Sequence, residues 1–341
     1  MRGAGRFWGL PLLGAMALSA CGGASRGSSG PGSASGTSAA GESTAAASFG
    51  PQIAVGSDFG CWLGTNKKVG CWGSLKDAAP DGAFRQISAA SFHACGVTEA
   101  GEAKCWGEYD AAPAGQFAQV SAGDQASCGV RVDGELVCWG AQGKTEYSAE
   151  LIEKCGSTKE YPECKDFSWL GMRIVMKRPK GKFKQVAVGG RHVCALARSG
   201  EVKCWAPAED DQDEAGAREV DDISLPPGKY RELAAGFLHT CGIEAGETAG
   251  KVVCAGGYEG QSEPTPEAAA AVHVAIGVVN SCALLADGHV SCWGSGERGA
   301  TSVPSDGGFV AVAVGLHVVC ALSAKGTPRC WGDDSSPAAR P

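Results

Sequence analysis

Seven pairs of cysteines divide the sequence from residue 51 onward into seven repeats. The two cysteines are ten residues apart in six pairs and thirteen apart in the fifth, Cys241 and Cys254. A glycine stands five residues before the first cysteine in six repeats, and Ala90 replaces it in the second. Trp follows the second cysteine in six repeats, and Ala255 replaces it in the fifth. Repeats of this length indicate a propeller, a solenoid or a repeat array.

The ten-residue spacing predicts a β-hairpin in each repeat. In the fourth repeat, two short alternating segments, 193–196 and 202–205, flank Arg198-Ser199-Gly200. If the hairpin loop has three residues, the cysteines face each other across the strands, close enough for a bridge. Such a loop favours glycine, with a positive φ, at its last position. The five regular repeats have glycine there: Gly101, Gly134, Gly200, Gly288 and Gly326.

We therefore expect the cysteines to form disulfides. Zinc sites are usually built from closely spaced cysteine couples, and the sequence has no CxxC, so metal binding is the less favoured alternative. A total of 17 cysteines also indicates an oxidising compartment. Cys155 and Cys164 lie together in one insertion and form an eighth expected pair. The predicted bridges are Cys61–Cys71, Cys95–Cys105, Cys128–Cys138, Cys155–Cys164, Cys194–Cys204, Cys241–Cys254, Cys282–Cys292 and Cys320–Cys330.

The N-terminal segment predicts export. Basic residues precede an apolar run, which is typical of a secretory signal and too short to span a membrane. The run ends in Leu18-Ser19-Ala20-Cys21, which resembles a bacterial lipobox, so we expect residues 1–20 to be a lipoprotein signal peptide and Cys21 to be lipidated. Gly22, rather than Asp, favours the outer membrane. The alternative is an ordinary signal peptide. Residues 21–50 are mostly Gly, Ser, Ala and Thr, so we expect a disordered tether.

Three segments of the repeat are similar to those of a known family. They are Phe-x-x-Val-x-x-Gly, His-x-Cys-Ala-Leu and Asp-Gly-x-Val-x-Cys-Trp-Gly, as in 183–189, 192–196 and 287–294. The pattern resembles the RCC1-like repeat, in the cysteine-containing version of secreted and lipid-anchored bacterial proteins. The resemblance covers residues 51 to 332 and implies an all-β fold, a seven-bladed β-propeller over 51–341. Because these repeats are short, we expect three strands in each blade, with a weak or absent fourth.

Histidine precedes the first cysteine by two positions in three repeats, at His93, His192 and His239. These side chains could form a catalytic or metal-binding set. The resemblance implies instead that they are structural hydrogen-bonding residues, because the family repeat carries His at this position.

The longest interruption of the repeat, 141–182, is the candidate binding loop. It could dock a protein or an anionic envelope polymer, and the alternative is a solvated excursion held by its own disulfide. Lys184 extends its basic run by one further residue. The candidate residues are Trp169, Arg173, Lys177, Arg178, Lys180 and Lys182.

Two other interruptions are less informative. Segment 207–228 is acidic, and its part 211–222 resembles an incomplete calcium loop in which Ala215 fills a ligand position and the closing Glu is missing. We therefore expect a solvated acidic loop and no metal. Segment 257–271 is rich in Pro and Ala and is expected to be a plain linker.

Charge and motifs limit the possible functions. The sequence has 30 basic and 37 acidic residues, a net charge of −7, which argues against binding to nucleic acid. It shows no convincing catalytic constellation and implies no cofactor. We expect a monomeric, lipid-anchored, non-enzymatic scaffold at the cell envelope. One alternative is an envelope polysaccharide hydrolase or lyase with paired carboxylates at the propeller centre. A remote alternative is guanine nucleotide exchange by family analogy, which export from the cytosol argues against.

Overall fold

The computed structural model describes residues 52–140, 143–148, 150–151, 154–155, 169–205, 223–246, 249–257 and 260–341. The chain divides into two compact units, residues 1–44 and 45–341, and every described residue belongs to the second. The expected signal peptide, the lipidation site Cys21 and the tether therefore lie outside the described residues. In the described part of the chain, no helix is long and apolar enough to cross a membrane.

The described residues form seven antiparallel sheets, each of three consecutive strands. The strands of the first four sheets are β1 (Gln52–Val55), β2 (Phe59–Leu63), β3 (Val69–Gly73), β4 (Phe84–Ala89), β5 (His93–Thr98), β6 (Ala103–Gly107), β7 (Phe117–Ser121), β8 (Ser127–Arg131), β9 (Leu136–Trp139), β10 (Phe183–Val188), β11 (Val193–Ala197) and β12 (Val202–Trp205). The strands of the last three are β13 (Tyr230–Ala235), β14 (His239–Glu244), β15 (Val252–Gly256), β16 (Ala271–Ile276), β17 (Asn280–Leu285), β18 (Val290–Gly294), β19 (Phe309–Val314), β20 (Val318–Ser323) and β21 (Pro328–Gly332). The helices are α2 (Trp169–Met176), η3 (Pro266–Ala270), η4 (Glu297–Gly299) and η5 (Pro337–Ala339).

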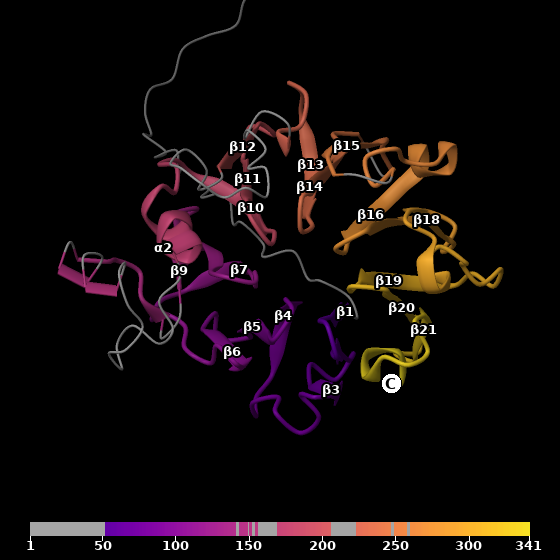
Figure 1. Cartoon of the computed structure of the whole chain (residues 1–341), viewed down its shortest axis with the longest axis horizontal. Helices are drawn as coiled ribbons and strands as arrows, with labels where there is room; N and C mark the ends of the chain where they lie inside the picture. The colour runs from indigo at the N-terminus through magenta and orange to yellow at the C-terminus, as the bar shows by residue number, and fades with distance from the viewer. Residues whose placement is uncertain are drawn as a thin grey trace, which may run out of the picture. The chain divides into compact units, whose positions relative to one another are not determined.

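The seven sheets are the blades of a closed ring (Figure 1). The first strand of each blade contacts the first strand of the next, in the order β1, β4, β7, β10, β13, β16 and β19. Strand β19 then contacts β1, which closes the circle. The expectation of an all-β, seven-bladed propeller with three strands in each blade is confirmed.

The second and third strands of every blade form the predicted disulfide-linked hairpin. In the fourth blade, Cys194 pairs with Cys204, and the loop Arg198-Ser199-Gly200 has φ of +88° at its glycine. All five glycines expected at this loop position have a positive φ, between +79° and +90°. Seven of the eight predicted bridges are present, with Cα atoms 4.0–4.1 Å apart. Cys155 is buried and disulfide-bonded, whereas Cys164, its expected partner, lies outside the described residues.

The hydrophobic core is divided among the seven contacts between blades. In the contact between the third and fourth blades, the disulfide face of one blade, with Cys128 and Cys138, packs against Val186, Val193 and Trp205 of the next. The same arrangement recurs around the ring, including the contact between the seventh blade and the first. The first cysteine of every blade is fully buried. Each bridge therefore links two strands and also supplies apolar surface to the neighbouring blade.

The glycine before each first cysteine allows neighbouring backbones to approach closely. A Cβ added to Gly189 would lie 2.2 Å from the carbonyl oxygen of Gly236. One added to Gly236 would lie 2.4 Å from that of Gly277, and one added to Gly277 would lie 2.2 Å from that of Gly315. Because real Cβ atoms do not approach oxygen so closely, any side chain at these turns would push the blades apart.

The tryptophan after the second cysteine fixes the segment that connects one blade to the next. The indole nitrogen of Trp205 donates a hydrogen bond to the carbonyl oxygen of Ile174 at 3.2 Å, and that of Trp331 to Ala300 at 3.0 Å. Each carbonyl belongs to the connection that precedes the blade of its tryptophan. The first blade has no preceding connection, and Trp72 donates instead to Ala338 in the C-terminal helix η5, at 2.8 Å.

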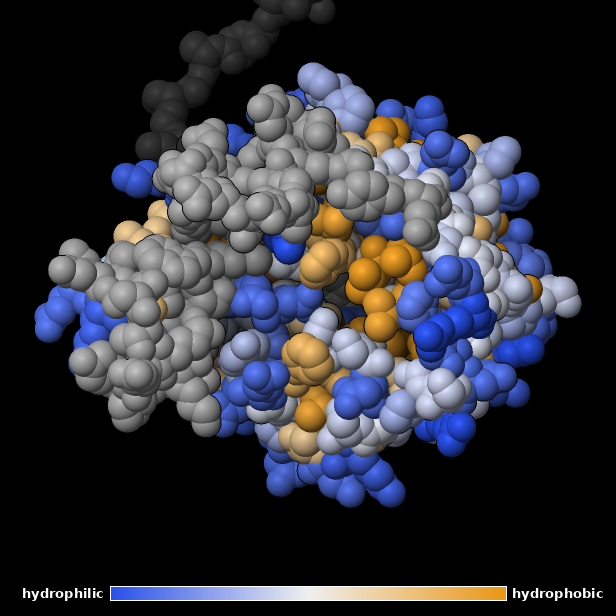
Figure 2. Space-filling model, viewed as in Figure 1, coloured by the Kyte–Doolittle hydropathy of each residue, from blue (hydrophilic) through white to orange (hydrophobic). Residues whose placement is uncertain are grey.

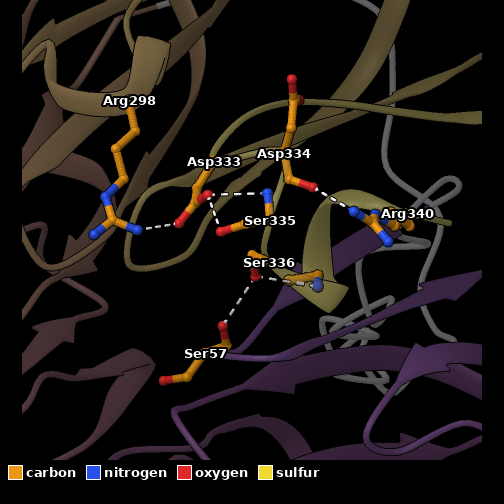
Figure 3. Close-up of polar contacts among 8 residues, drawn as sticks. Ser57, Arg298, Asp333, Asp334, Ser335, Ser336 and Arg340 are labelled. Carbon is orange, nitrogen blue, oxygen red and sulfur yellow. Dashed lines mark hydrogen bonds and ion pairs between the residues drawn. The ribbon is translucent and has the colours of Figure 1, made fainter.

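Further polar contacts hold the C-terminal segment at this seam (Figure 3). Asp333 forms an ion pair with Arg298 and accepts hydrogen bonds from the amide and the hydroxyl of Ser335, at 3.0 and 2.5 Å. The Ser335 hydroxyl and the Arg298 guanidinium lower the pKa of Asp333 to about 2. Arg340 donates to the carbonyl oxygen of Asp334 at 2.9 Å. The ring is thus closed by a C-terminal segment whose conformation is held by hydrogen bonds among its own residues.

The hydrogen bond that closes the ring predicts that replacing tryptophan by phenylalanine destabilises the protein more at Trp72 than at the equivalent Trp106. Trp72→Phe leaves the buried Ala338 carbonyl without its donor, whereas Trp106, equally buried, has no hydrogen-bond partner for its indole nitrogen among the described residues. We expect Trp72→Phe to lower the free energy of unfolding by about 1–2 kcal/mol more than Trp106→Phe. Denaturant unfolding without reductant measures both variants, and equal losses would contradict this account of the closure.

Candidate functional site

A cavity of about 580 Å³ lies between the first strands of the blades, along the centre of the ring. A second cavity, of about 80 Å³, lies among the glycine-rich turns that follow these strands. The two cavities share Val55, Ala89, Ile276 and Val314 in their walls. The central channel is therefore wide over most of its length and narrow at the glycine turns.

Glutamine side chains link neighbouring blades along the channel wall. The side-chain oxygen of Gln185 accepts a hydrogen bond from the amide of Leu233, and its side-chain nitrogen donates to the Leu233 carbonyl oxygen, both at 2.9 Å. Gln86 and Gln119 bind Val120 and Val186 of the next blade in the same way. Gln52 occupies the equivalent position in the first blade and bonds to the second. A side-chain amide suits this position because it both accepts and donates.

The fifth and sixth blades replace these amides with an ion pair. Glu232 accepts a hydrogen bond from the amide of Val274 at 3.0 Å, and its Oε1 lies 2.5 Å from Nδ1 of His273. Burial alone would lower the pKa of His273, but the neighbouring Glu232 carboxylate outweighs burial and raises it. Burial alone would raise the pKa of Glu232, but His273 and the Val274 amide lower it. Each member of the pair therefore favours the charged form of the other.

Two further cations lie on the same side of the channel. Lys184 in β10 and Arg231 in β13 are each the extra residue of a β-bulge near the start of the strand. A residue in this position is not paired with the neighbouring strand, so the bulge changes the direction of its side chain. Burial lowers the pKa of Lys184, and its ammonium group has no acidic partner among the described residues. Arg231 donates from Nη2 to the carbonyl oxygen of Ala271 at 2.7 Å, while its Nε has no hydrogen-bond partner in the described part of the chain.

The opposite side of the channel is apolar. It is formed by the first strands of the sixth, seventh and first blades, with Ala275, Ile276, Ala313, Val314 and Ile53 among the lining residues. Figure 2 shows the hollow at the centre of the ring, with hydrophobic residues gathered beside it on the side of β16 and β19. The cavity therefore has one charged wall and one hydrophobic wall.

The structure describes the side chains of four of the six residues of the candidate binding loop. Lys182 forms an ion pair with Asp133 at 2.7 Å, and Arg178 donates to the carbonyl oxygen of Val175 at 2.6 Å. Lys177 and Lys180 are exposed. Trp169 and Arg173 lie in α2, and their side chains are outside the described residues.

Helix α2 also shows that the insertion is partly structural. Ile174 and Val175 are fully buried and belong to the core between the third and fourth blades. This part of the insertion is therefore not a solvated excursion, because Ile174 and Val175 pack against the ring. The adjacent apolar residues Ile174 and Val175 were the sequence signal for this packing.

The three histidines of the repeat have the structural role that the resemblance implied. Each is buried, and its Nε2 lies 2.7–2.9 Å from a hydroxyl of the following blade. Burial lowers the pKa of His93 and of His192 to about 4, and that of His239 to about 3. The hydroxyl partners of His93, His192 and His239 are Ser127, Thr240 and Ser281, respectively.

Asn280 has the same place in the sixth blade without such a partner. It is fully buried, and neither atom of its side-chain amide has a hydrogen-bond partner among the described residues. The acidic segment proposed as an incomplete calcium loop, 211–222, lies outside the described residues. Within the described ranges, no group of three or more His, Cys, Asp or Glu side chains is placed to hold a metal ion.

Sequence reasoning missed the channel. Its sequence signal was the polar residue two positions after the opening aromatic of several repeats, as in Phe117-Ala-Gln119 and Phe183-Lys-Gln185. In the fifth and sixth repeats, Glu232 and His273 stand in place of that glutamine. Only the closed ring shows that their two side chains contact each other.

The ring of seven three-stranded sheets around a channel defines a seven-bladed β-propeller. Three of its repeats, residues 117–144, 183–205 and 271–300, match the family model of the Regulator of chromosome condensation (RCC1) repeat. The chain is an RCC1-like repeat propeller. No curated protein matches the sequence significantly.

Solved structures share this fold at low sequence identity. The CRINKLY WD40 ectodomain of the Arabidopsis thaliana receptor kinase ACR4 is 24% identical with a TM-score of 0.60, over 85% of this chain and 97% of that one. The ectodomain of the Physcomitrella patens receptor kinase CR4 is 22% identical with a TM-score of 0.60, over 82% and 72%. Prp20p of Saccharomyces cerevisiae, described with its binding to Gsp1p and histones, is 16% identical with a TM-score of 0.50, over 73% and 72%. At these identities the likeness shows the fold alone.

The buried histidines predict a loss of stability in mild acid. Because the pKa of His192 in the folded state, about 4, lies below the ordinary histidine value of 6.5, its contribution to the free energy of unfolding is full above pH 6.5 and falls as the pH drops toward 4. We expect the stability difference between wild type and His192→Asn to shrink by about 2 kcal/mol between pH 7.5 and pH 5. Denaturant unfolding of both proteins at the two pH values measures this change, and a constant difference would show that His192 titrates normally.

Proposed function

We propose that this protein is a binding scaffold that holds a partner protein with an acidic surface. The supporting observation is the run of basic residues that leads into the fourth blade, within 177–184, in a protein whose net charge is −7. Lys177 and Lys180 are exposed beside the ring, with no ion-pair partner among the described residues. A positive surface of this kind attracts an acidic partner and orients its approach.

The construction of the ring suits a scaffold. The seven disulfides and the continuous core between blades hold the first strands in fixed positions, so the basic residues are presented without a large ordering cost. The fold of Prp20p, which binds Gsp1p and histones, is a precedent for partner binding by a propeller of this type. That precedent concerns the fold and does not identify the partner of this chain.

The scaffold proposal predicts a charge-dependent interaction. We expect Lys177→Glu/Lys180→Glu to reduce capture of the partner from a cell-envelope extract at least tenfold. Lys76→Glu/Lys203→Glu is the matched control, because both lysines are exposed and the change in net charge is equal. Captured proteins are quantified by mass spectrometry with the full chain as bait.

Two outcomes would contradict this proposal. Equal capture by both double variants would exclude Lys177 and Lys180 as the docking surface. Retention of an anionic polysaccharide, with no protein that depends on the two lysines, would favour the polymer-binding alternative.

We further propose that the scaffold is displayed at the cell envelope through a lipid on Cys21, with the outer membrane as its site. The lipobox-like tetrad and Gly22 support this proposal. We expect the full chain to fractionate with membranes and Cys21→Ala to be released into the soluble fraction. Immunoblotting of the two fractions measures the change, and Cys155→Ala controls for the loss of a cysteine elsewhere. Membrane association of Cys21→Ala equal to that of wild type would exclude the lipid anchor.

The geometry does not favour the hydrolase or lyase alternative. That mechanism requires paired carboxylates at the centre of the ring. Glu232 is the only carboxylate among the described residues that line the cavity, and it is paired with His273. We therefore propose no catalytic function.

A further inference from the structure

The two walls of the central cavity have opposite chemistry. Lys184, Arg231, Glu232 and His273 lie in neighbouring blades and form the charged wall. The rest of the cavity wall, from the end of β16 and from β19 and β1, presents aliphatic side chains and alanines. A cavity of about 580 Å³ is in the range that small ligands occupy. A ligand that matches both walls must carry a polar group at one end and an apolar body at the other.

The charged wall specifies the sign of the polar group. It carries three cationic groups and one carboxylate when His273 is protonated, and that carboxylate is already paired with His273 at 2.5 Å. The Lys184 ammonium has no partner among the described residues, and Arg231 donates from Nη2 to the carbonyl oxygen of Ala271, which leaves its Nη1 as the donor for a ligand in the cavity. An anion placed between them would pair with both, and such charge-assisted hydrogen bonds are stronger than neutral ones.

The apolar part of the cavity limits the charge of the anion. A ligand loses part of its hydration on entering a cavity lined largely by aliphatic side chains, and this loss costs more for a group with two charges than for a group with one. A carboxylate has one charge at neutral pH, whereas a phosphate monoester has nearly two. The cavity therefore favours a carboxylate.

We propose that the central channel binds a small amphiphilic carboxylate. The carboxylate group lies between the Lys184 ammonium and the Arg231 guanidinium. The apolar body lies against Ala275, Ile276 and Ala313 of the apolar wall. The ligand enters from the wide part of the channel, because the glycine turns narrow the other end. This site is separate from Lys177 and Lys180, so it does not depend on the scaffold's protein partner.

Isothermal titration calorimetry of the full chain with octanoate tests the proposal. We expect saturable one-to-one binding of octanoate, and at least tenfold weaker binding of neutral 1-octanol and of acetate. Octanol keeps the apolar body without the charge, and acetate keeps the charge without the body. Equal affinity for octanoate and octanol would overturn the role of the charged wall, and equal affinity for acetate would overturn that of the apolar wall.

Two lysines separated by one residue provide the matched variants. Lys184→Ala removes a cation that lines the cavity, and we expect it to weaken octanoate binding at least tenfold. Lys182→Ala removes a cation that is paired with Asp133 and does not line the cavity, and we expect binding within twofold of wild type. Arg231→Gln is a second variant of the charged wall, expected to weaken binding similarly.

The melting temperature of each variant, compared with wild type, distinguishes loss of the site from loss of the fold. Equal octanoate binding by Lys184→Ala and Lys182→Ala would overturn the proposal. So would the absence of binding to the folded wild type. Neither result would affect the capture experiment, which varies Lys177 and Lys180 only.

Discussion

The structure depends on the packing of the disulfide face of each blade against the opposite face of the next. This contact is repeated at all seven junctions, with tryptophan at six of them and Ala255 in its place at the junction of the fourth and fifth blades, and it contains most of the buried apolar side chains. A single three-stranded sheet buries too little surface to be stable alone, so each blade relies on both neighbours. The close approach of backbones at the glycine turns follows from the same contact. Every other feature, including the channel, exists only because these junctions close a circle.

The sequence predicted what lies within one repeat. The hairpins, their bridges and the loop glycines follow from local spacing, because a short antiparallel pair has few possible registers. The number of blades followed from counting copies and from the family resemblance. Even the role of His192 could be anticipated, because a buried polar residue that recurs in a repeat usually has a structural partner.

What the sequence did not predict depends on contacts between repeats. The glutamine links could not be recognised, because Gln185 bonds to Leu233, which is 48 residues away, across a long insertion. The ion pair of Glu232 and His273 joins two blades for the same reason. The closure by Ala338 was also missed, because its partner Trp72 is 266 residues distant and nothing in the last residues resembles a blade. Helix α2 interrupts the repeat pattern, so the sequence did not predict that it packs against the ring as part of the connection between the third and fourth blades.

The pairing of histidines with hydroxyls gives the ring a fixed order. His93, His192 and His239 each find Ser or Thr one position before the first cysteine of the next blade. In the third blade, Ala126 replaces histidine, and Val193 takes the place of the hydroxyl. A blade moved from one of these junctions to a junction without the hydroxyl would leave a buried imidazole without its partner, at a cost of about 1–3 kcal/mol. Repeat proteins commonly evolve by duplicating, losing or exchanging units. In this ring an exchange between the two kinds of junction is penalised, whereas an exchange among the three histidine junctions keeps every pair.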